Sequence, residues 1–177
     1  MNTLKYSNID FNFKKCTIEN IDEICEIQEI AFQNLTDTNL LRRNTREVLQ
    51  TCLFDPHYTL GVFHKDKLIA FAVLYDGQNT IENIGRDIGI AEENLNFVVN
   101  FKLVIVLPDY RGNGLQQELI HKLEAIAKAN NKRIMCATIS PFNTYSIKNF
   151  ERSGFKFHSK KTKYGNLERC IYYKNLN

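Results

Sequence analysis

The stretch VIVLPDYRGNGLQQEL, residues 104–119, decides the fold of this chain. An apolar run stops at Pro108, two glycines flank Asn113, and a helix-like spacing of leucines begins directly afterwards. Glycine adopts backbone conformations that are strained for other residues. The pattern therefore predicts a strand, a tight turn and a helix in immediate succession.

The turn in this stretch has the composition of an anion-binding site. The first N–H groups of a helix have no partner inside it, and the peptide dipoles add roughly half a positive charge at that end. Glycines let a ligand approach the backbone, and the Arg111 guanidinium suits phosphate. Residues 111–116 thus predict either a phosphate-binding turn or a tight turn without a ligand. They lack the Gly-Lys-Ser/Thr ending of a Walker loop, and Gln117 replaces the third glycine of a dinucleotide fingerprint.

Working outward, strand and helix patterns alternate along the chain. Strands are predicted at residues 11–17, 58–76 (a hairpin that turns at 64–67), 97–107, 133–140, 155–159 and 168–174. Helices are predicted at residues 21–31, 44–53, 115–130 and 143–154. This order predicts an α/β fold, a single-domain mixed sheet of about seven strands flanked by about four helices. The apolar run at 97–107 predicts a central strand buried on both faces.

Length and composition narrow the possible functions. The chain has 177 residues, which suits one domain over residues 1–177, and its 44% hydrophobic residues can supply a core. Twenty-three basic and 20 acidic side chains leave a net charge of +3, which is too small to indicate a nucleic-acid partner. The charge is uneven, because residues 76–93 carry five acids and one arginine. That segment is either a surface for a cationic partner or a solvated loop.

The cysteines and the N-terminus indicate a cellular compartment. Five cysteines, an odd number without a C-x-x-C spacing, predict reduced thiols rather than disulfides. The first sixteen residues lack the apolar core of a signal peptide, and no run is long enough to cross a membrane. We therefore expect a cytoplasmic protein without a membrane partner. The four histidines share no metal-ligand spacing, so we expect no metal site.

A second stretch, SPFNTYSIKNFERSGF at residues 140–155, lies one strand after the glycine turn. Pro-x-Tyr-Arg-Gly-x-Gly between strand and helix, followed by this Asn-bearing helix ending in Gly-Phe, resembles the GNAT superfamily of acyl-CoA-dependent N-acyltransferases. The order of elements is also similar, and the resemblance covers essentially the whole chain. It implies the GNAT fold, acetyl-CoA as co-substrate, and transfer of the acetyl group to a primary amine by direct attack on the thioester.

The resemblance also implies a binding site for coenzyme A. Main-chain N–H groups of the turn would hold the pyrophosphate, and main-chain atoms at the end of the long strand would bind the pantetheine arm and the acyl carbonyl. The cofactor-binding residues implied are Val104, Ile105, Val106, Arg111, Gly112, Asn113, Gly114, Leu115, Gln116, Gln117, Asn143 and Phe150. The family has Gly or Ala where Gln116 stands, and a larger side chain there still leaves its main-chain N–H free.

This chain departs from the family pattern at the position of the residue that protonates the leaving thiolate. The family often has a tyrosine seven residues after the position of Asn143, and this chain has Phe150 there. Ser146 shares a helix face with Phe150 and is the candidate acid. A thiolate is also a tolerable leaving group without an acid, because thiols have a pKa of ~8.5.

The attacking amine must be neutral, and this requirement points to a base. Deprotonating a lysine-type amine of pKa ~10.4 at pH 7 costs about 4.6 kcal/mol. A base, a water relay or a desolvating site must offset that cost. The candidate catalytic bases are carboxylates of the acidic segment, foremost Glu92 and Glu93, with Asp87 beside them.

Several alternatives stay open at this point. The acceptor is a small-molecule or protein amine, and the chain is a monomer or homodimer. The rival function is a catalytically inactive acyl-CoA-binding sensor or regulatory module of the same fold, supported by Phe150. The basic run at residues 156–163 is a contact for the 3′-phosphate of the cofactor, a contact for an acidic partner, or a solvated hairpin tip.

Overall fold

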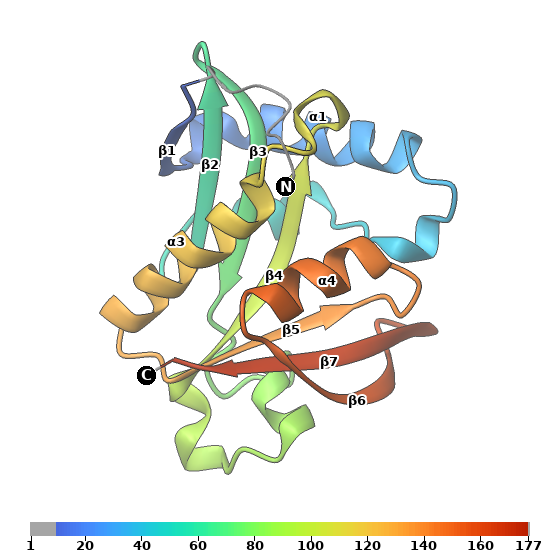
Figure 1. Cartoon of the computed structure of the whole chain (residues 1–177). Helices are drawn as coiled ribbons and strands as arrows, with labels where there is room; N and C mark the ends of the chain where they lie inside the picture. The colour runs from blue at the N-terminus through green and yellow to red at the C-terminus, as the bar shows by residue number, and fades with distance from the viewer. Residues whose placement is uncertain (1–9, 177) are drawn as a thin grey trace.

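Two long apolar segments form the centre of the sheet. β3 (Lys67–Tyr75) and β4 (Val98–Val106) are rich in β-branched and aromatic residues, which suit a pleated, buried surface. In the computed structural model, which describes residues 10–176, seven strands form one sheet in the order β1-β2-β3-β4-β5-β7-β6 (Figure 1). The other strands are β1 (Asn12–Lys15), β2 (Tyr58–His64), β5 (Ile134–Ile139), β6 (Lys156–Lys163) and β7 (Leu167–Asn175). Most of the N-terminal stretch assessed for a signal peptide lies outside the described residues.

Helices cover both faces of this sheet. They are α1 (Ile21–Gln33), α2 (Arg46–Thr51), α3 (Leu115–Ala129) and α4 (Thr144–Arg152). In Figure 1, α3 and α4 lie in front of the sheet and α1 passes behind it. Both α1 and α3 pack on β3 and β4. The predicted mixed sheet of seven strands with four helices is therefore confirmed, with short 3-10 turns added between the main elements.

Local sequence sets the ends of the helices. The Thr45 side chain accepts the N–H of Val48 at the start of α2, as expected for an N-cap threonine. α3 ends at the predicted asparagine pair, where Asn131 adopts a left-handed φ of 58°. Along α3, the predicted stripe is buried, with Leu119 and Leu123 fully inaccessible to solvent. The apolar period thus fixes which face of α3 meets the sheet.

The sheet opens between two of its parallel strands. β4 and β5 pair only from Val98↔Ile134 to Phe101↔Ala137, although both strands continue beyond that point. Lys102 is an extra residue in β4 against β3, because Phe101 pairs with Leu74 and Leu103 with Val73. A bulge of this kind bends its strand and interrupts the ladder. The prediction that β4 is buried on both faces holds up to Phe101, and beyond it burial alternates because one side borders the opening.

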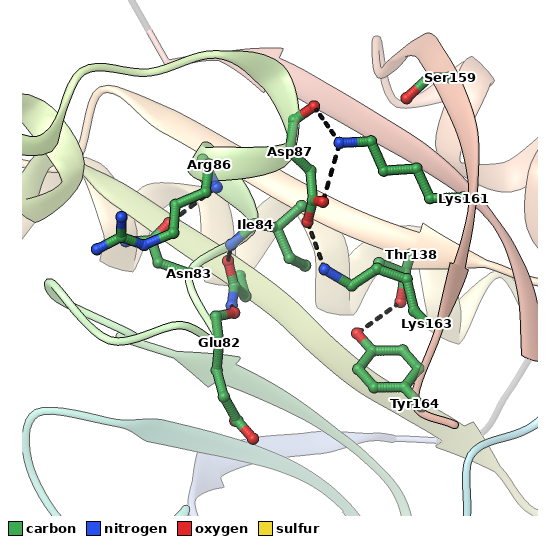
Figure 2. A network of polar contacts seen from close by, with 12 residues as sticks. Glu82, Asn83, Ile84, Arg86, Asp87, Thr138, Ser159, Lys161, Lys163 and Tyr164 are labelled. Carbon is green, nitrogen blue, oxygen red and sulfur yellow. Dashed lines mark hydrogen bonds and ion pairs between the residues drawn. The ribbon is translucent and has the colours of Figure 1, made fainter. Parts of the chain in front are cut away.

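The C-terminal hairpin differs from its prediction. The first strand was expected to end at residue 159, but β6 includes the whole basic run to Lys163. Two of its lysines are engaged within the chain: Lys161 and Lys163 form ion pairs with Asp87, at 3.1 and 2.5 Å (Figure 2). The run is therefore neither a solvated tip nor free for a cofactor phosphate at these two positions. β-pairing with β7 extends the strand because the partner residues are available through Leu167.

The cysteines are free thiols and most of them are buried. Cys16, Cys52, Cys136 and Cys170 are buried, Cys25 is partly buried, and all five are free thiols as predicted. Burial raises the pKa of Cys16 and of Cys136 to about 12, so both pack as small apolar groups.

None of the helices in residues 10–176 combines the length and the apolar character that a bilayer crossing needs.

Candidate functional site

The turn between β4 and α3 depends on two glycines. Gly112 and Gly114 have φ values of 85° and 72°, in the left-handed region that disfavours other residues. A Cβ at either position would meet no atom within 4 Å, so it is the backbone angle, not crowding, that requires glycine. The same openness means that the protein leaves room directly beside the turn.

The backbone of this turn is rich in unpartnered donors. Gly114 is the N-cap of α3 and makes no side-chain cap, and the first bond of the helix runs from Glu118 N to Gly114 O at 3.1 Å. The main-chain N–H groups from Gly112 to Gln117 find no acceptor among the described residues. Six donors at the positive end of a 15-residue helix form a site for an anion such as a phosphate.

A cavity of about 450 Å³ opens beside these donors. Its size lies within the range of small-molecule sites, which runs from about 300 to 1,000 Å³. Its wall is built from the end of β4, the glycine turn, the start of α4 and the segment after α1. The lining residues are Ala31, Leu35, Leu40, Leu41, Val104, Ile105, Val106, Tyr110, Arg111, Gly112, Gly114, Leu115, Gln116, Asn143, Tyr145 and Ser146.

Most residues predicted from the sequence to bind the cofactor meet at this cavity. Nine of the twelve line it, together with the candidate acid Ser146. Asn113 and Gln117 belong to the turn without lining the cavity, and the Asn113 side chain instead donates to Tyr110 O at 2.9 Å. Phe150 lines a second, smaller cavity. The fold thus brings three separate segments of the predicted set together, and their role in binding stays a prediction.

The free edge of β4 presents main-chain groups to the opening. Leu107 N–H donates to Ile69 O at 3.0 Å, and hydrogen-bonded residues alternate along an antiparallel pair. Val104 and Val106 therefore direct their N–H and C=O groups away from β3, toward the side on which β5 has diverged. Val106 O already accepts from Arg111 Nε at 3.3 Å. An extended amide chain can add to such an edge as another strand would.

Gln116, the residue that departs from the family pattern, joins two helices. Its Nε2 donates to Ser146 Oγ at 3.3 Å, and its Oε1 accepts from Asn149 Nδ2 at 2.8 Å. Asn143 caps α4 by accepting the N–H of Ser146 at 3.0 Å. The larger side chain is therefore directed to α4 and leaves the N–H groups of the turn accessible.

Phe150 is a core residue. It is 2% exposed, and its ring meets Phe101 and Phe155 edge-on, with centroids 5.2 and 4.9 Å away. On the same helix, Tyr145 lies five residues before Phe150 and lines the larger cavity. The structure thus offers a phenol at the cavity wall that is not among the site residues predicted from the sequence.

The carboxylates predicted as bases lie elsewhere. Glu92 is exposed and paired with Arg86, whose Nη2 lies 3.0 Å from Glu92 Oε2, and this hydrogen bond lowers the Glu92 pKa. Glu93 is exposed in the same 3-10 turn, and Asp87 is held by the lysines of β6 (Figure 2). None of these three acids lines either cavity. All three belong to 3-10 turns between β3 and β4, which do not contribute to the lining of either cavity.

The second cavity, of about 90 Å³, borders the first and lies between the diverging strands. Leu40, Leu41, Val104, Asn143 and Ser146 line both. The remaining walls of the smaller cavity come from Arg42, Asn44, Phe101, Lys102, Leu103, Thr138, Ile139, Ser140, Phe150, Tyr164 and Arg169. Across the lining of the two cavities, as far as the described chain shows, there is no aspartate, glutamate or histidine.

Sequence reasoning missed the polar wall of this second cavity. Arg42, Lys102 and Arg169 come from three segments far apart in the sequence, and no motif links them. One local signal existed: Arg169 sits at the start of an apolar strand, where a cation is unusual. Periodicity alone could not show which neighbours this arginine would meet.

Comparison with known proteins gives one family match. A family model described as the acetyltransferase (GNAT) family matches residues 21–155, which include the cavity-lining segments from α1 to α4. A search of curated protein sequences found no match.

Solved structures share the fold over nearly the full chain. An N-acetyltransferase from Staphylococcus aureus superposes with a TM-score of 0.73 at 19% identity, covering 95% of this chain and 99% of that one. A phosphinothricin acetyltransferase from Sinorhizobium meliloti, solved with acetyl-CoA, has a TM-score of 0.72 at 17% identity, with 94% and 88% covered. The ribosomal-protein-S18-alanine N-acetyltransferase from Escherichia coli has a TM-score of 0.70 at 13% identity, with 94% of each chain covered. At these identities the likeness establishes the fold alone.

Proposed function

Because this chain belongs to the acetyltransferase (GNAT) family, we propose that it transfers the acetyl group of acetyl-CoA to a primary amine. One observation carries the proposal: the glycine turn at the start of α3 has six unpartnered N–H groups, and four of its six residues line a cavity of about 450 Å³ beside the free edge of β4. This combination fits a ligand with a diphosphate at one end and an amide-bearing arm at the other. A structure of a relative with acetyl-CoA supports the same assignment.

The residues present fit such a co-substrate along its length. The N–H groups from Gly112 to Gln117 would hold the pyrophosphate, with Arg111 beside them at the cavity wall. The main-chain groups of Val104 and Val106 would pair with the amides of the pantetheine arm. When bound, acetyl-CoA supplies an activated thioester. The chain itself contributes position, which lowers the barrier by holding amine and acyl carbon in a reactive arrangement.

The residues that line the cavities limit which groups can take the proton of the amine and which can protonate the leaving sulfur. Neither lining includes a carboxylate or imidazole from the described residues, so the acceptor amine loses its proton to water rather than to a side chain. On the leaving side, Ser146 Oγ is held by Gln116 Nε2, and the phenol of Tyr145 lines the same wall. Either hydroxyl can donate a proton to the departing sulfur. The modest basicity of a thiolate, with a thiol pKa of ~8.5, makes a strong acid unnecessary.

One test separates binding from turnover. Calorimetric titration with coenzyme A measures the proposed site, and a thiol-release assay with acetyl-CoA and a panel of amines measures transfer. We expect coenzyme A to bind and at least one amine to accelerate thiol release. If coenzyme A produces no binding heat with the folded protein, the proposal is wrong.

A sensor without turnover is the second candidate function. It is favoured by the lack of an acidic or imidazole side chain in the described lining and by a phenylalanine at position 150. For this function, coenzyme A or acetyl-CoA binds with normal affinity and no amine changes the rate of thiol release. The same pair of measurements therefore distinguishes the two candidates.

A further inference from the structure

The second cavity has a cationic wall. Arg42 reaches it from the segment before α2, Lys102 from the bulge of β4, and Arg169 from β7. No aspartate or glutamate is among its described lining residues. Three positive side chains from distant parts of the sequence thus converge on a cavity of about 90 Å³ that borders the larger one.

Arg169 is buried without a counter-ion. It is 3% exposed, its Nη1 donates to Glu168 O at 2.9 Å, and its Nη2 has no hydrogen-bond partner in residues 10–176. Burying an unpaired charge is unfavourable unless another group compensates it. Burial lowers the Arg169 pKa and the positive charge of Arg42 adds to this effect, whereas Tyr164 and Asp37 oppose it. Asp37 forms no ion pair with Arg169 among the described residues.

Arg42 is positioned with its donors free. Its guanidinium lies over the ring of Tyr164, 4.1 Å from the centroid. The hydroxyl of Tyr164 is hydrogen-bonded to Thr138 Oγ1 at 3.1 Å, which fixes the ring against β5 (Figure 2). This cation–π contact leaves N–H groups of the guanidinium available to another acceptor. The side chain of Arg42 makes no hydrogen bond or ion pair within the part of the chain described here.

Lys102 adds a partly neutralised charge. Its Nζ lies 3.8 Å from Glu82 Oε2 and 4.5 Å from the centroid of the Tyr75 ring. Glu82 is not among the residues that line the cavity. When the charge of Glu82 is counted together with that of Lys102, Arg42 and Arg169 still leave the cavity with a net positive charge.

We infer that the second cavity binds an anionic group of the acceptor, so that the substrate is a small amine that also carries a carboxylate or a phosphate-type group. The inference rests on the proposed acetyl transfer. Val104, Asn143 and Ser146 line both cavities, so an anion held in the smaller cavity would leave the amine of the same small molecule close to the larger one. The same charges disfavour polyamines and lysine-rich peptides, because like charges repel in a site of low dielectric.

The test uses product analogues that keep the anion or neutralise it. The twenty N-acetyl-L-amino acids and their C-terminal carboxamides are titrated calorimetrically into protein saturated with coenzyme A. We expect at least one acid to bind about 30-fold more tightly than its own carboxamide, the size of effect typical of a buried charge pair. N-acetylaminomethylphosphonate, compared with N-acetylglycine, distinguishes a phosphate-type group from a carboxylate. Equal binding of every acid and its carboxamide, or no binding of any acid, would overturn the inference.

Two variants and a matched control locate the effect. Arg42→Gln is expected to remove the preference for the acid while changing carboxamide binding by less than about twofold. Arg43→Gln is the control, because Arg43 pairs with Glu29 at the surface and lines neither cavity. Arg169→Gln should act as Arg42→Gln does, and circular dichroism shows whether it folds. If the control variant loses the preference as Arg42→Gln does, the assignment to this cavity is wrong.

The proposed acetyl transfer and the inferred class of acceptor are refuted by different results. If coenzyme A does not bind the wild-type chain, the proposed function fails before any acceptor is considered. If coenzyme A binds and the acids show no advantage over their carboxamides, the cofactor site stands and only the inferred acceptor class is refuted.

Discussion

Gln116 Nε2 donates a hydrogen bond to Ser146 Oγ at 3.3 Å, so the first turn of α3 is tied to the first turn of α4. Through Oε1 the same side chain also holds Asn149, at 2.8 Å. Residues of both helix starts line the larger cavity. A residue outside the family pattern therefore has a structural role of its own, which is to hold the starts of α3 and α4 together beside the cavity.

Replacing this side chain should loosen the site. Gln116→Ala removes two hydrogen bonds and is expected to lower the free energy of unfolding by about 1–2 kcal/mol. Because the N–H of residue 116 remains, coenzyme A should still bind, with an affinity reduced only several-fold. Urea unfolding and calorimetry measure the two effects. Gln117→Ala is the control, since no hydrogen bond of its side chain occurs in the described structure, and an equal loss there would contradict the bridging role.

A charged side chain in the glycine turn should abolish cofactor binding. Gly114→Asp places a carboxylate beside the six donors and should weaken coenzyme A binding on the order of 100-fold. The left-handed φ adds a stability cost of about 1–2 kcal/mol. Gly89→Asp is the matched control, because Gly89 also has a left-handed φ (79°) in open space but lies outside both cavities. Unchanged affinity in folded Gly114→Asp would show that the phosphates bind elsewhere.

Truncating Phe150 should act mainly on folding. Phe150→Ala removes a ring packed between Phe101 and Phe155 and is expected to cost about 3–5 kcal/mol of stability. Phe142→Ala, on an exposed side chain, should change stability by less than about 0.5 kcal/mol. Chemical denaturation compares the two. A Phe150→Ala protein of normal stability that has lost only thiol release would show instead that the ring shapes the reacting groups.

The acidic segment should be dispensable for transfer. Glu92→Gln and Glu93→Gln remove the carboxylates that the sequence offered as bases, but both side chains are exposed and line neither cavity. We expect kcat/KM to stay within about twofold of the wild-type value. Steady-state thiol release with the best acceptor measures this. A loss of several orders of magnitude in a folded variant would restore the original assignment of a base to this segment.

The pH profile should follow the acceptor rather than the enzyme. With no described carboxylate or imidazole in the lining, only the neutral fraction of the amine reacts. That fraction rises tenfold per pH unit below the pKa of the amine, which is ~10.4 for a lysine-type amine. Log kcat/KM should therefore rise with a slope near one from about pH 6 to 9. A plateau that begins near pH 7 with several acceptors of different basicity would reveal an enzyme base.

Much of the architecture was predictable because its causes are local. The apolar period of α3 and the break at Pro108 fix a strand and a helix from neighbouring residues alone, and the structure confirms both. Gly112 and Gly114 were predicted to form a turn with free N–H groups, since glycine is the residue that tolerates the required φ. The Asn143 cap likewise follows from a side chain that bonds three residues ahead.

The rest depends on long-range packing. Whether Glu92 or Ser146 reaches the cavity depends on where 3-10 turns and helices settle on the sheet, which spacing along the chain does not encode. Phe150 reads as a missing acid in the sequence and proves to be a core residue, because its surroundings come from β4 and from the segment after α4.

The sequence by itself determined a strand, a glycine turn and a helix whose exposed N–H groups suit a phosphate, since each depends on residues within one or two turns of each other. Only the tertiary structure decided that β4 and β5 part after Phe101, and that Arg42 and Arg169 meet in the space between them. The physical reason is that a cavity is made by residues distant in the chain. Its shape and charge exist only once the sheet has paired and the helices have packed.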